Sequence, residues 1–437
     1  MSDTLQPASA AAASDVAASA TSESRPPAAV IATAEEALAT TRALAAEFAV
    51  DATARDLQRR LPRAELDRVS AAGITAITVP AEHGGADVPT RVLGEVIATL
   101  AAADASIGQI PQNHFFFVEV LRQNGTPEQQ QRFFAEVLAG KRFGNALAEP
   151  GATHALEFRT TIRPDGDGWF RLDGAKYYST GALLADWVPV YAVDEQGRVN
   201  AAYVEAGADG LEIVDDWEGV GQRTTASGTV RLNGVRIPAD QVVPHWKTFE
   251  KTEAFGAYGQ FLHAAIDTGI AIGALDAARE FVQTKARPWA EAGVARAAEE
   301  PLVINQFGEL ALRVRAARAL LREAAEALDA ARAAIAAQAS DTPAPAPAAG
   351  AADAEALAAE ASAAVAAARA QADISAVSVA SDFLALGGAR AASTRGGLDR
   401  FWRDARTHTL HDPRRWKLQH LGNYELNGVA PPRSGIV

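Results

Sequence analysis

The sequence predicts an α+β chain with an N-terminal helical domain, a middle antiparallel β-domain and a C-terminal four-helix bundle. Three observations predict this order. Apolar residues recur at helical spacing over 33–141, short alternating runs fill 142–245, and long Ala-rich helical stretches occupy 246–437. With 437 residues, of which 48% are hydrophobic, the chain has the length for two or three domains and a large core.

Composition excludes several classes of function. The 41 basic and 54 acidic residues give a net charge of −13, which argues against a nucleic-acid or anionic-membrane partner. The absence of cysteine excludes disulfides, thiolate nucleophiles and Cys-ligated metals. Residues 1–32 are expected to form a disordered tail without the features of a signal peptide. No run of 18 uncharged apolar residues predicts a membrane span, so we expect a cytoplasmic protein.

The N-terminal domain, 33–141, begins with a helix-start signal. Thr33-Ala34-Glu35-Glu36 has the spacing of a capping box, in which the hydroxyl and the carboxylate bond the first backbone N–H groups. Val92–Ala103 and His114–Asn124 are predicted to form two buried helices. Thr126 precedes a Pro-Glu pair and is the expected N-cap of a further short helix.

The middle domain, 142–245, alternates apolar and polar residues in short runs. Asp165-Gly166-Asp167-Gly168, Asp173-Gly174 and Asn233-Gly234 separate these runs and have the composition of hairpin turns. The pattern predicts a small antiparallel sandwich or barrel. The expected strands are 161–163, 169–172, 176–179, 187–193, 199–204, 211–214 and 229–232.

The C-terminal part, 246–437, has the helical period. Gly269 and Gly273 stand four apart on the first helix and permit close approach of another helix, within the subunit or between subunits. A Pro-Ala-rich insertion at about 338–352 interrupts the bundle, and 426–432 is expected to leave it. The expected helices are 261–285, 304–337, 353–386 and 398–410.

Two segments of the middle domain carry a resemblance to a known family. Gly144–Pro150 and Leu172–Gly181 are similar to the flavin-contacting segments of the acyl-CoA dehydrogenase fold, and the domain order from about residue 33 is the same. The resemblance implies a flavin held between the β-domain and the bundle, and a homotetramer. No Gly-x-Gly-x-x-Gly segment follows a predicted strand, so a dinucleotide-binding fingerprint is not expected to hold the flavin.

The C-terminal segment is similar to one branch of that family. Phe401–Pro413 resembles the flavin monooxygenases of sulfur acquisition, which include dibenzothiophene monooxygenase; Val214–Trp217, Gly221–Thr224 and Lys285–Trp289 are also similar. Dehydrogenation of an acyl-CoA needs a carboxylate base, but Gly387–Arg395 contains no acid.

The resemblance implies a two-component monooxygenase. It would take reduced FMN from a separate flavin reductase and use O₂ on an organosulfur compound. The alternative is an FAD-dependent acyl-CoA dehydrogenase-like enzyme, because some members of the family place the base elsewhere.

Three histidines are candidate catalytic groups. His408 and His411 stand three apart on the last predicted helix and are expected to share one face. With the resemblance, His411 is expected to give a proton to a flavin peroxide or to act as a base, with His408 in support. Without the resemblance, two such histidines would more often have a structural role. His114 lies beside three phenylalanines and is either a core histidine or a polar group of the substrate pocket.

The resemblance also implies a set of flavin-binding residues. Short hydroxyl and amide side chains are expected at the polar edge of the ring, an aromatic side chain beside it, and Ser227 or arginines at the phosphate. No metal site is expected, because the adjacent His411 and Asp412 point apart on a helix. The expected flavin-binding residues are Asn145, Tyr178, Ser179, Thr180, Trp217, Ser227, Arg287 and Arg390.

Overall fold

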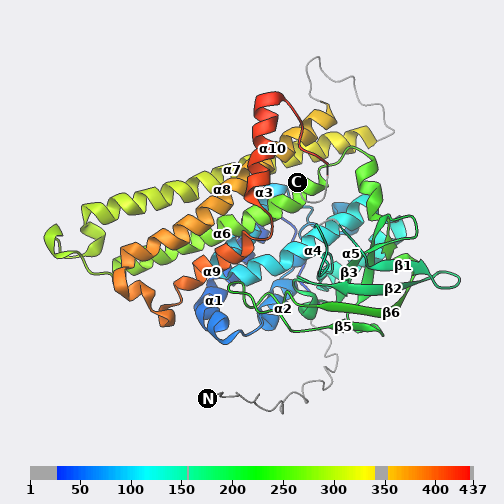
Figure 1. The fold of residues 1–437 in the computed structure, drawn as a ribbon, viewed down its shortest axis with the longest axis horizontal. Helices are drawn as coiled ribbons and strands as arrows, with labels where there is room; N and C mark the ends of the chain where they lie inside the picture. The colour runs from blue at the N-terminus through cyan, green and yellow to red at the C-terminus, as the bar shows by residue number, and fades with distance from the viewer. Residues whose placement is uncertain (1–26, 155–156, 340–352, 434–437) are drawn as a thin grey trace, which may run out of the picture.

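The computed structural model describes residues 27–154, 157–339 and 353–433, and Figure 1 shows its helical and β parts. Most of the expected tail and most of the expected insertion, at 1–26 and 340–352, lie outside these residues. The N-terminal part is helical, as predicted. Its helices are α1 (Ala34–Gln58), α2 (Arg63–Ala71), α3 (Thr90–Ala103), α4 (Ala105–Asn124) and α5 (Pro127–Leu138).

The last residues of the expected tail are packed against the helical domain. The backbone N–H of Ala29 donates to the carbonyl of Ala71 at the end of α2. The Ile31 side chain is 4% exposed and belongs to the main core. Ordered structure therefore begins before the first helix.

Side chains cap three helices of the N-terminal part. The Thr33 hydroxyl accepts from the backbone N–H of Glu36 at 3.1 Å, and Thr126 forms a complete capping box with Gln129, which confirms both predicted N-caps. Asp104 caps α4, so this helix begins nine residues before the predicted start at His114. Its Pro111 is accommodated inside the helix.

The middle part contains one seven-stranded sheet with the strand order β5-β6-β2-β1-β3-β4-β7. All neighbouring pairs are antiparallel except β1 and β3, which are parallel, so the sheet is mixed. Its buried face carries alternate apolar residues of β2, β3 and β6. The strands are β1 (Thr161–Pro164), β2 (Trp169–Lys176), β3 (Trp187–Val193), β4 (Val199–Glu205), β5 (Leu211–Ile213), β6 (Val230–Pro238) and β7 (Val242–Val243).

Two predicted turns are wrong, because the strands run through them. Asp173 and Gly174 lie inside β2, and Asn233 and Gly234 lie inside β6. The two pairs face each other at a β-bulge, where the register shifts between Leu172 and Asp173. The backbone N–H of Gly234 donates to the Asp173 carboxylate at 2.8 Å, and Gly234 has φ +64°. These glycines and Asp173 therefore take part in a β-bulge and not in a hairpin turn.

The C-terminal part is built on three long helices, α6, α7 and α8. Adding a Cβ to Gly269 or Gly273 of α6 would bring it 2.4 or 2.3 Å from a carbonyl oxygen of α3, so the two glycines permit close packing within the subunit. The predicted fourth helix ends earlier than expected, and a further helix follows it. The helices are α6 (Phe255–Thr284), α7 (Pro301–Ala339), α8 (Ala354–Gly387), α9 (Asp399–His408) and α10 (Arg414–Asn427).

Within the described ranges, two segments are long and apolar enough to span a membrane by length and composition alone. They are Phe255–Thr284, whose apolar window is 83% buried in the fold, and Ala354–Ala392, whose window is 44% buried. Both contribute side chains to the main core, as the central helices of a bundle do.

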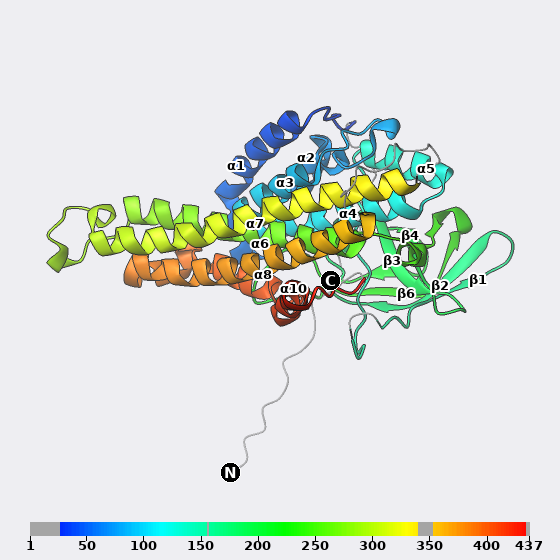
Figure 2. The same cartoon turned by 90° about the horizontal axis from the view of Figure 1, so that it is seen from above.

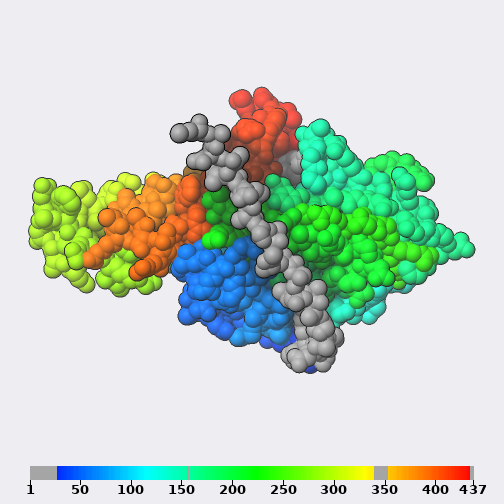
Figure 3. Space-filling view, turned by 60° about the horizontal axis from the view of Figure 1, so that its bottom comes forward, coloured from blue at the N-terminus to red at the C-terminus, as the bar shows by residue number. Residues whose placement is uncertain are grey.

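One end of the bundle projects beyond the rest of the molecule. Figure 2 shows the long helices extending to the left, away from the sheet, and Figure 3 shows the N-terminal part between that projecting end and the β part. The projecting end contains the segment between α6 and α7 and the segment after α8 (Figure 1).

Candidate active site

Two loops of the β part lie side by side and form the floor of the candidate site. We call residues 177–181 the β2 loop, because they follow β2, and residues 221–228 the β6 loop, because they precede β6. The backbone N–H of Ser179 donates to the carbonyl of Gly228 at 3.1 Å, which fixes one loop against the other.

A chain of buried hydroxyls connects the same loops. The Thr180 Oγ1 and Ser227 Oγ atoms are 2.7 Å apart, and Ser227 Oγ is also 2.7 Å from Thr225 Oγ1. The Gly181 N–H donates to the Thr225 carbonyl at 3.0 Å. Because these three hydroxyls are buried and bonded to one another, they set the shape of the floor.

Both loops contain strained backbone. Among the described residues, five residues other than glycine have positive φ, and Tyr178 (57°), Gln222 (46°) and Ala226 (49°) lie in these two loops. Such conformations cost free energy and persist where the surrounding structure enforces them, commonly at functional sites. The strain marks this pair of loops as a candidate binding surface.

Buried polar atoms without hydrogen-bond partners gather at the same place. Ser179 Oγ and Gln222 Nε2 have none among the described residues, nor does Gln109 Oε1 on α4. The helix α4 packs beneath both loops, since its Ile110 belongs to one apolar cluster with Ala226. A buried group of this kind normally has a partner. Hydroxyl and amide groups match the N–H and C=O edge of a flavin ring, so the residues present fit FMN.

An aromatic pair forms the rim of this surface. The ring centroids of Tyr178 and Trp217 are 6.1 Å apart with an edge-to-face geometry. Trp217 Nε1 donates to the Gln222 carbonyl at 2.9 Å, and Asn145 Nδ2 donates to the Tyr178 carbonyl at 3.3 Å. The structure therefore brings Asn145, Tyr178, Ser179, Thr180, Trp217 and Ser227 together. Their contact with a flavin stays a prediction.

The helix α9 covers the start of the β6 loop. The Gln222 N–H donates to Asp404 Oδ1 at 2.6 Å, and the Gly221 N–H donates to Thr407 Oγ1 at 2.8 Å. A Cβ on Gly221 would lie 2.0 Å from the Arg403 carbonyl oxygen, so only glycine fits there. This contact holds α9, which ends at His408, against the β6 loop.

His408 belongs to a buried ionic network. Its Nδ1 lies 2.6 Å from Asp267 Oδ1, and its Nε2 lies 3.0 Å from Nδ1 of His263. The other oxygen of Asp267 accepts from Arg369 on α8. Asp267 and His408 are 0% and 1% exposed, so this network lies in the interior between α6, α8 and α9.

His411 lies next to this network but not on the same helix as His408, which corrects the prediction of a shared helical face. The helix α9 ends at His408 with Thr409 as its C-cap, so His411 lies in the turn that follows. The His411 ring stacks on His263 with centroids 4.1 Å apart, and its side chain is 47% exposed. The protein packed around the ring lowers the pKa of His411 to about 4, against the opposing charge of Asp412.

The lowered pKa leaves the His411 imidazole uncharged at neutral pH, where it would accept a proton only weakly. Both expected roles of His411, proton donor to a flavin peroxide and base, stay predictions.

His114 lies away from the other histidines and both of its ring nitrogens are bonded to backbone. Nδ1 accepts from the Phe143 N–H at 3.0 Å, and Nε2 lies 2.9 Å from the Thr75 carbonyl. Burial lowers the pKa of His114 to about 4, and the cavity beside it measures only about 10 Å³. This geometry gives His114 a structural role between the N-terminal and β parts.

The two arginines expected at the flavin phosphate are not near the other site residues. Arg287 follows the end of α6, and Arg390 follows α8 and donates to the Lys285 carbonyl at 3.0 Å. Both segments belong to the projecting end of the bundle, far from β2 and the loop that follows it (Figure 1). Within one chain they cannot contact a flavin on the β2 loop.

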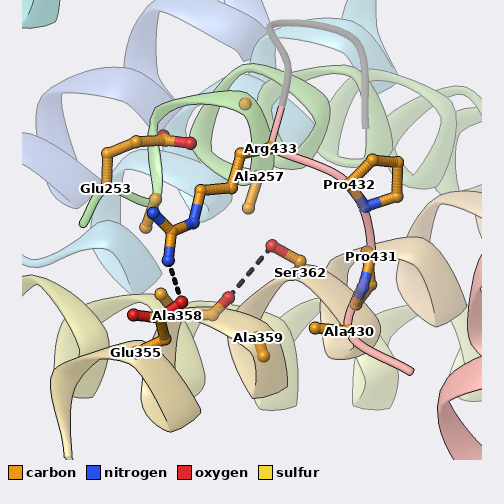
Figure 4. Close-up of a pocket in the computed structure, with 12 residues that line it drawn as sticks. Glu253, Ala257, Glu355, Ala358, Ala359, Ser362, Ala430, Pro431, Pro432 and Arg433 are labelled. Atoms are coloured by element: carbon orange, nitrogen blue, oxygen red, sulfur yellow. Dashed lines mark hydrogen bonds and ion pairs between the residues drawn. The ribbon is translucent and has the colours of Figure 1, made fainter. Parts of the chain in front are cut away.

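The cavity in Figure 4 is a separate feature. Residues 430–433 pack against the first turns of α6 and α8, and Arg433 forms an ion pair with Glu355. The described part of the C-terminal tail therefore returns to the bundle instead of leaving it. At about 50 Å³ the cavity holds one or two waters and is too small for a flavin.

Sequence reasoning missed five residues of the site. His263 and Asp267 were visible only as polar interruptions of an apolar helix, although their spacing of four places both on one face. Asp404 and Gln222 are joined across 182 positions of sequence, so no local pattern connects them. The missed residues are Gln222, His263, Asp267, Arg369 and Asp404.

Comparison with protein families matches nearly the whole ordered chain. The acyl-CoA dehydrogenase N-terminal, middle and C-terminal domain models match residues 32–141, 144–235 and 261–414. The chain is 32% identical over 409 residues to a dibenzothiophene monooxygenase from Rhodococcus qingshengii, which covers 90% of this chain and 94% of the relative.

Two further similarities concern FMN. The chain is 30% identical over 408 residues to a probable FMNH2-dependent monooxygenase, SfnC, from Pseudomonas putida, with 91% and 96% coverage. Its structure matches the crystal structure of FMN-bound TdsC from Paenibacillus sp. A11-2 with a TM-score of 0.82. The two are 31% identical, and the match covers 92% of this chain and 100% of that chain.

Proposed function

The chain belongs to the acyl-CoA dehydrogenase family, and we propose that it is a two-component flavin monooxygenase that oxidises an organosulfur compound. In the proposed reaction one atom of O₂ is added to sulfur and the other leaves as water. Reduced FMN, when bound, supplies the two electrons. The product of this reaction on a sulfide is a sulfoxide, and a second turnover gives the sulfone.

One observation carries the proposal: the chain has histidines at and just after the end of α9, and no carboxylate in the segment where a dehydrogenase would carry its base. His411 and the buried His263–His408 pair lie at the end of α9, which contacts the β6 loop. The segment after α8, Gly387–Arg395, contains no Asp or Glu. Imidazole is the side chain whose ordinary pKa lies closest to neutral pH, and it can hold or move a proton at a reacting oxygen.

The remaining site residues have binding roles in this proposal. Ser179 Oγ and Gln222 Nε2 would bind the polar edge of the ring, and the bonded hydroxyls of Thr180 and Ser227 hold the loop in shape. Trp217 and the exposed Tyr178 form the aromatic rim of the site and would reduce the access of water to a bound flavin. Exclusion of water favours oxygen transfer over release of hydrogen peroxide.

The cofactor and its source follow from the same comparisons. FMN is favoured over FAD because the relatives that name a flavin name FMN or its reduced form. A separate NADH-dependent flavin reductase would deliver it reduced, which agrees with a cytoplasmic reaction.

The assembly is proposed to be a homotetramer. Arg287 and Arg390 reach a flavin phosphate only if the projecting end of one subunit lies against the β part of another. Large apolar side chains of α7 near that end are exposed: Leu302, Ile304 and Leu312. Native mass spectrometry of the purified protein tests the assembly and the number of bound flavins together.

The activity is tested with the full chain, a flavin reductase, NADH, FMN and ¹⁸O₂. We expect dibenzothiophene to yield a sulfoxide or sulfone carrying ¹⁸O, and His411→Gln to release hydrogen peroxide instead of oxidised sulfur compound. Consumption of no organosulfur compound from a panel of sulfides, sulfones and sulfinates contradicts the proposal. Anaerobic bleaching of bound FAD by butyryl-CoA establishes the dehydrogenase alternative instead.

A further inference from the structure

Asp267 is a buried carboxylate whose two oxygens are both engaged. Oδ1 lies 2.6 Å from Nδ1 of His408, and Oδ2 accepts from the Arg369 guanidinium. Although burial alone raises the pKa of Asp267, the neighbouring His408 and Arg369 together hold it below the ordinary value. An ionised carboxylate is only an acceptor, so Nδ1 of His408 carries a proton.

The next bond in the network runs between two histidines. His408 Nε2 and His263 Nδ1 lie 3.0 Å apart and share one proton. If His408 is neutral, its Nε2 accepts and His263 Nδ1 donates. If His408 is an imidazolium, the direction is reversed. The charges around the pair decide between these two arrangements.

The positive and negative side chains around His408 and His263 are equal in number when neither histidine is an imidazolium. Among the described residues around this interior, three cations and three carboxylates on α6, α8, α10 and the turn before α10 form ion pairs. Of these carboxylates, Asp267 also contacts His408, and its charge is already balanced by Arg369. The pairs are Arg369 with Asp267, Arg414 with Asp373, and Lys417 with Asp412.

The environment of His263 supports the same conclusion. Burial is the largest cause that lowers the pKa of His263 far below its ordinary value, so His263 carries one ring proton at neutral pH. With the charge of Asp267 already balanced by Arg369, His408 donates from Nδ1 to Asp267 and accepts at Nε2 from His263.

We propose that Asp267 is a positioning residue that fixes His408 and His263 in the Nδ1–H tautomer, with Nε2 of His263 left as the free acceptor of the pair. His411 stacks on that ring, so the tautomers set by Asp267 define the polar surface beside the proposed base. The catalytic part of this inference rests on the proposed monooxygenase function. The assignment of the tautomers does not depend on that function.

The tautomers are read directly in the flavin-free protein. The full chain is labelled with ¹⁵N in its eight histidine rings, and long-range ¹H–¹⁵N spectra are recorded at neutral pH. We expect His408 and His263 to be protonated at Nδ1. His114 is the internal control, because its Nδ1 accepts from Phe143 N–H and its proton must be on Nε2. Single His→Gln variants assign the signals.

Asp267→Asn should reverse both tautomers together. Arg369 has only donors, so the amide oxygen must face it and the amide NH₂ must face His408. His408 Nδ1 then becomes an acceptor, its proton moves to Nε2, and His263 must accept at Nδ1. The matched control is Asp373→Asn, which removes another buried carboxylate of the cluster that pairs with Arg414. It should leave the histidine tautomers unchanged.

The same variants give a kinetic readout. Loss of a group that orients an active-site imidazole costs about 10- to 100-fold in activity, and we expect a fall of that size in kcat for Asp267→Asn. FMN affinity, measured by fluorescence quenching, should stay as in the wild type. The lower limb of the pH–kcat profile should also move, which a merely structural change would not cause.

The outcomes separate this inference from the proposed function. An Nε2–H tautomer of His263 or a doubly protonated His408 in the wild type overturns the inference, and this spectrum needs no variant to fold. Unchanged tautomers and kcat in Asp267→Asn also overturn it. If the tautomers are as expected but the wild type oxidises no sulfur compound, the proposed function fails and the assignment of Asp267 stands.

Discussion

The carboxylate of Asp404 and the backbone N–H of Gln222 lie 2.6 Å apart, and this bond joins α9 to the loop that forms the floor of the site. Burial is the main cause that raises the pKa of Asp404 to about 7, while the Gln222 N–H and Arg400 oppose the rise. The attachment of α9 to this loop therefore depends on a group that changes charge near neutral pH.

Asp404→Asn should remove a pH dependence of stability. Because folding raises this pKa, the contribution of Asp404 is complete below its ordinary value of 3.8 and is lost as pH rises through about 7. Each unit of the rise corresponds to about 1.4 kcal/mol. Calorimetry of the flavin-free protein should show the Tm of the wild type falling between about pH 4 and 7 relative to the variant. Parallel curves would contradict this.

Ser179→Ala and Ser227→Ala should separate binding from stability. Ser179 Oγ has no partner among the described residues, so its removal should weaken FMN binding by about 1 kcal/mol and leave the Tm unchanged. Ser227 Oγ bonds Thr180 and Thr225, so its removal should also lower the free energy of unfolding by about 1–3 kcal/mol. FMN titration and thermal unfolding measure the two effects. An equal loss of Tm in both variants would exclude a ligand-facing role for Ser179.

Lys176→Met should destabilise the fold far more than Lys141→Met. Lys176 Nζ is buried, 2.7 Å from Glu149 Oε1 and 3.0 Å from the Leu147 carbonyl, whereas Lys141 pairs with Glu136 on the surface. Removing one partner of a buried pair costs about 3–5 kcal/mol, and an exposed pair about 0–1 kcal/mol. Denaturant unfolding provides both values. Similar losses for the two variants would show that Glu149 finds other partners.

Gly221→Ala should displace the β6 loop. Its Cβ would meet the Arg403 backbone at 2.0 Å, and backbone cannot move aside as a flexible side chain does. We expect FMN binding to be lost and the Tm to fall. Gly422→Ala, in α10 where nothing lies within 4 Å of the new Cβ, should stabilise the helix by about 1 kcal/mol. Wild-type FMN affinity in Gly221→Ala would show that this contact does not shape the site.

Features that depend on neighbouring residues were predictable from sequence. Thr33 and Thr126 cap their helices as expected, because an N-cap is formed by a side chain and backbone within three residues. Asp173-Gly174 and Asn233-Gly234 were predicted to form turns, but they lie at a β-bulge. The same residue types serve both structures, and only the pairing of β2 with β6 distinguishes them.

The polar interior of the site was not predictable from spacing. His408 was identified by resemblance, but its partner Asp267 lies 141 positions away in the chain, and Asp267 in turn accepts from Arg369 of a third helix. His263 and Asp267 interrupt an apolar helix without any local signal of what they contact. Resemblance also placed Arg287 and Arg390 at the flavin, and the fold of a single chain does not bring them there.

The position of these two arginines at the projecting end of the bundle has a genetic consequence. If each flavin is completed by a neighbouring subunit, a chain defective at Gly221 and a chain defective at Arg287 carry faults in different halves of the binding surface. Co-expression of the two inactive variants should then restore part of the activity by complementation, since some hybrid sites receive an intact half from each parent.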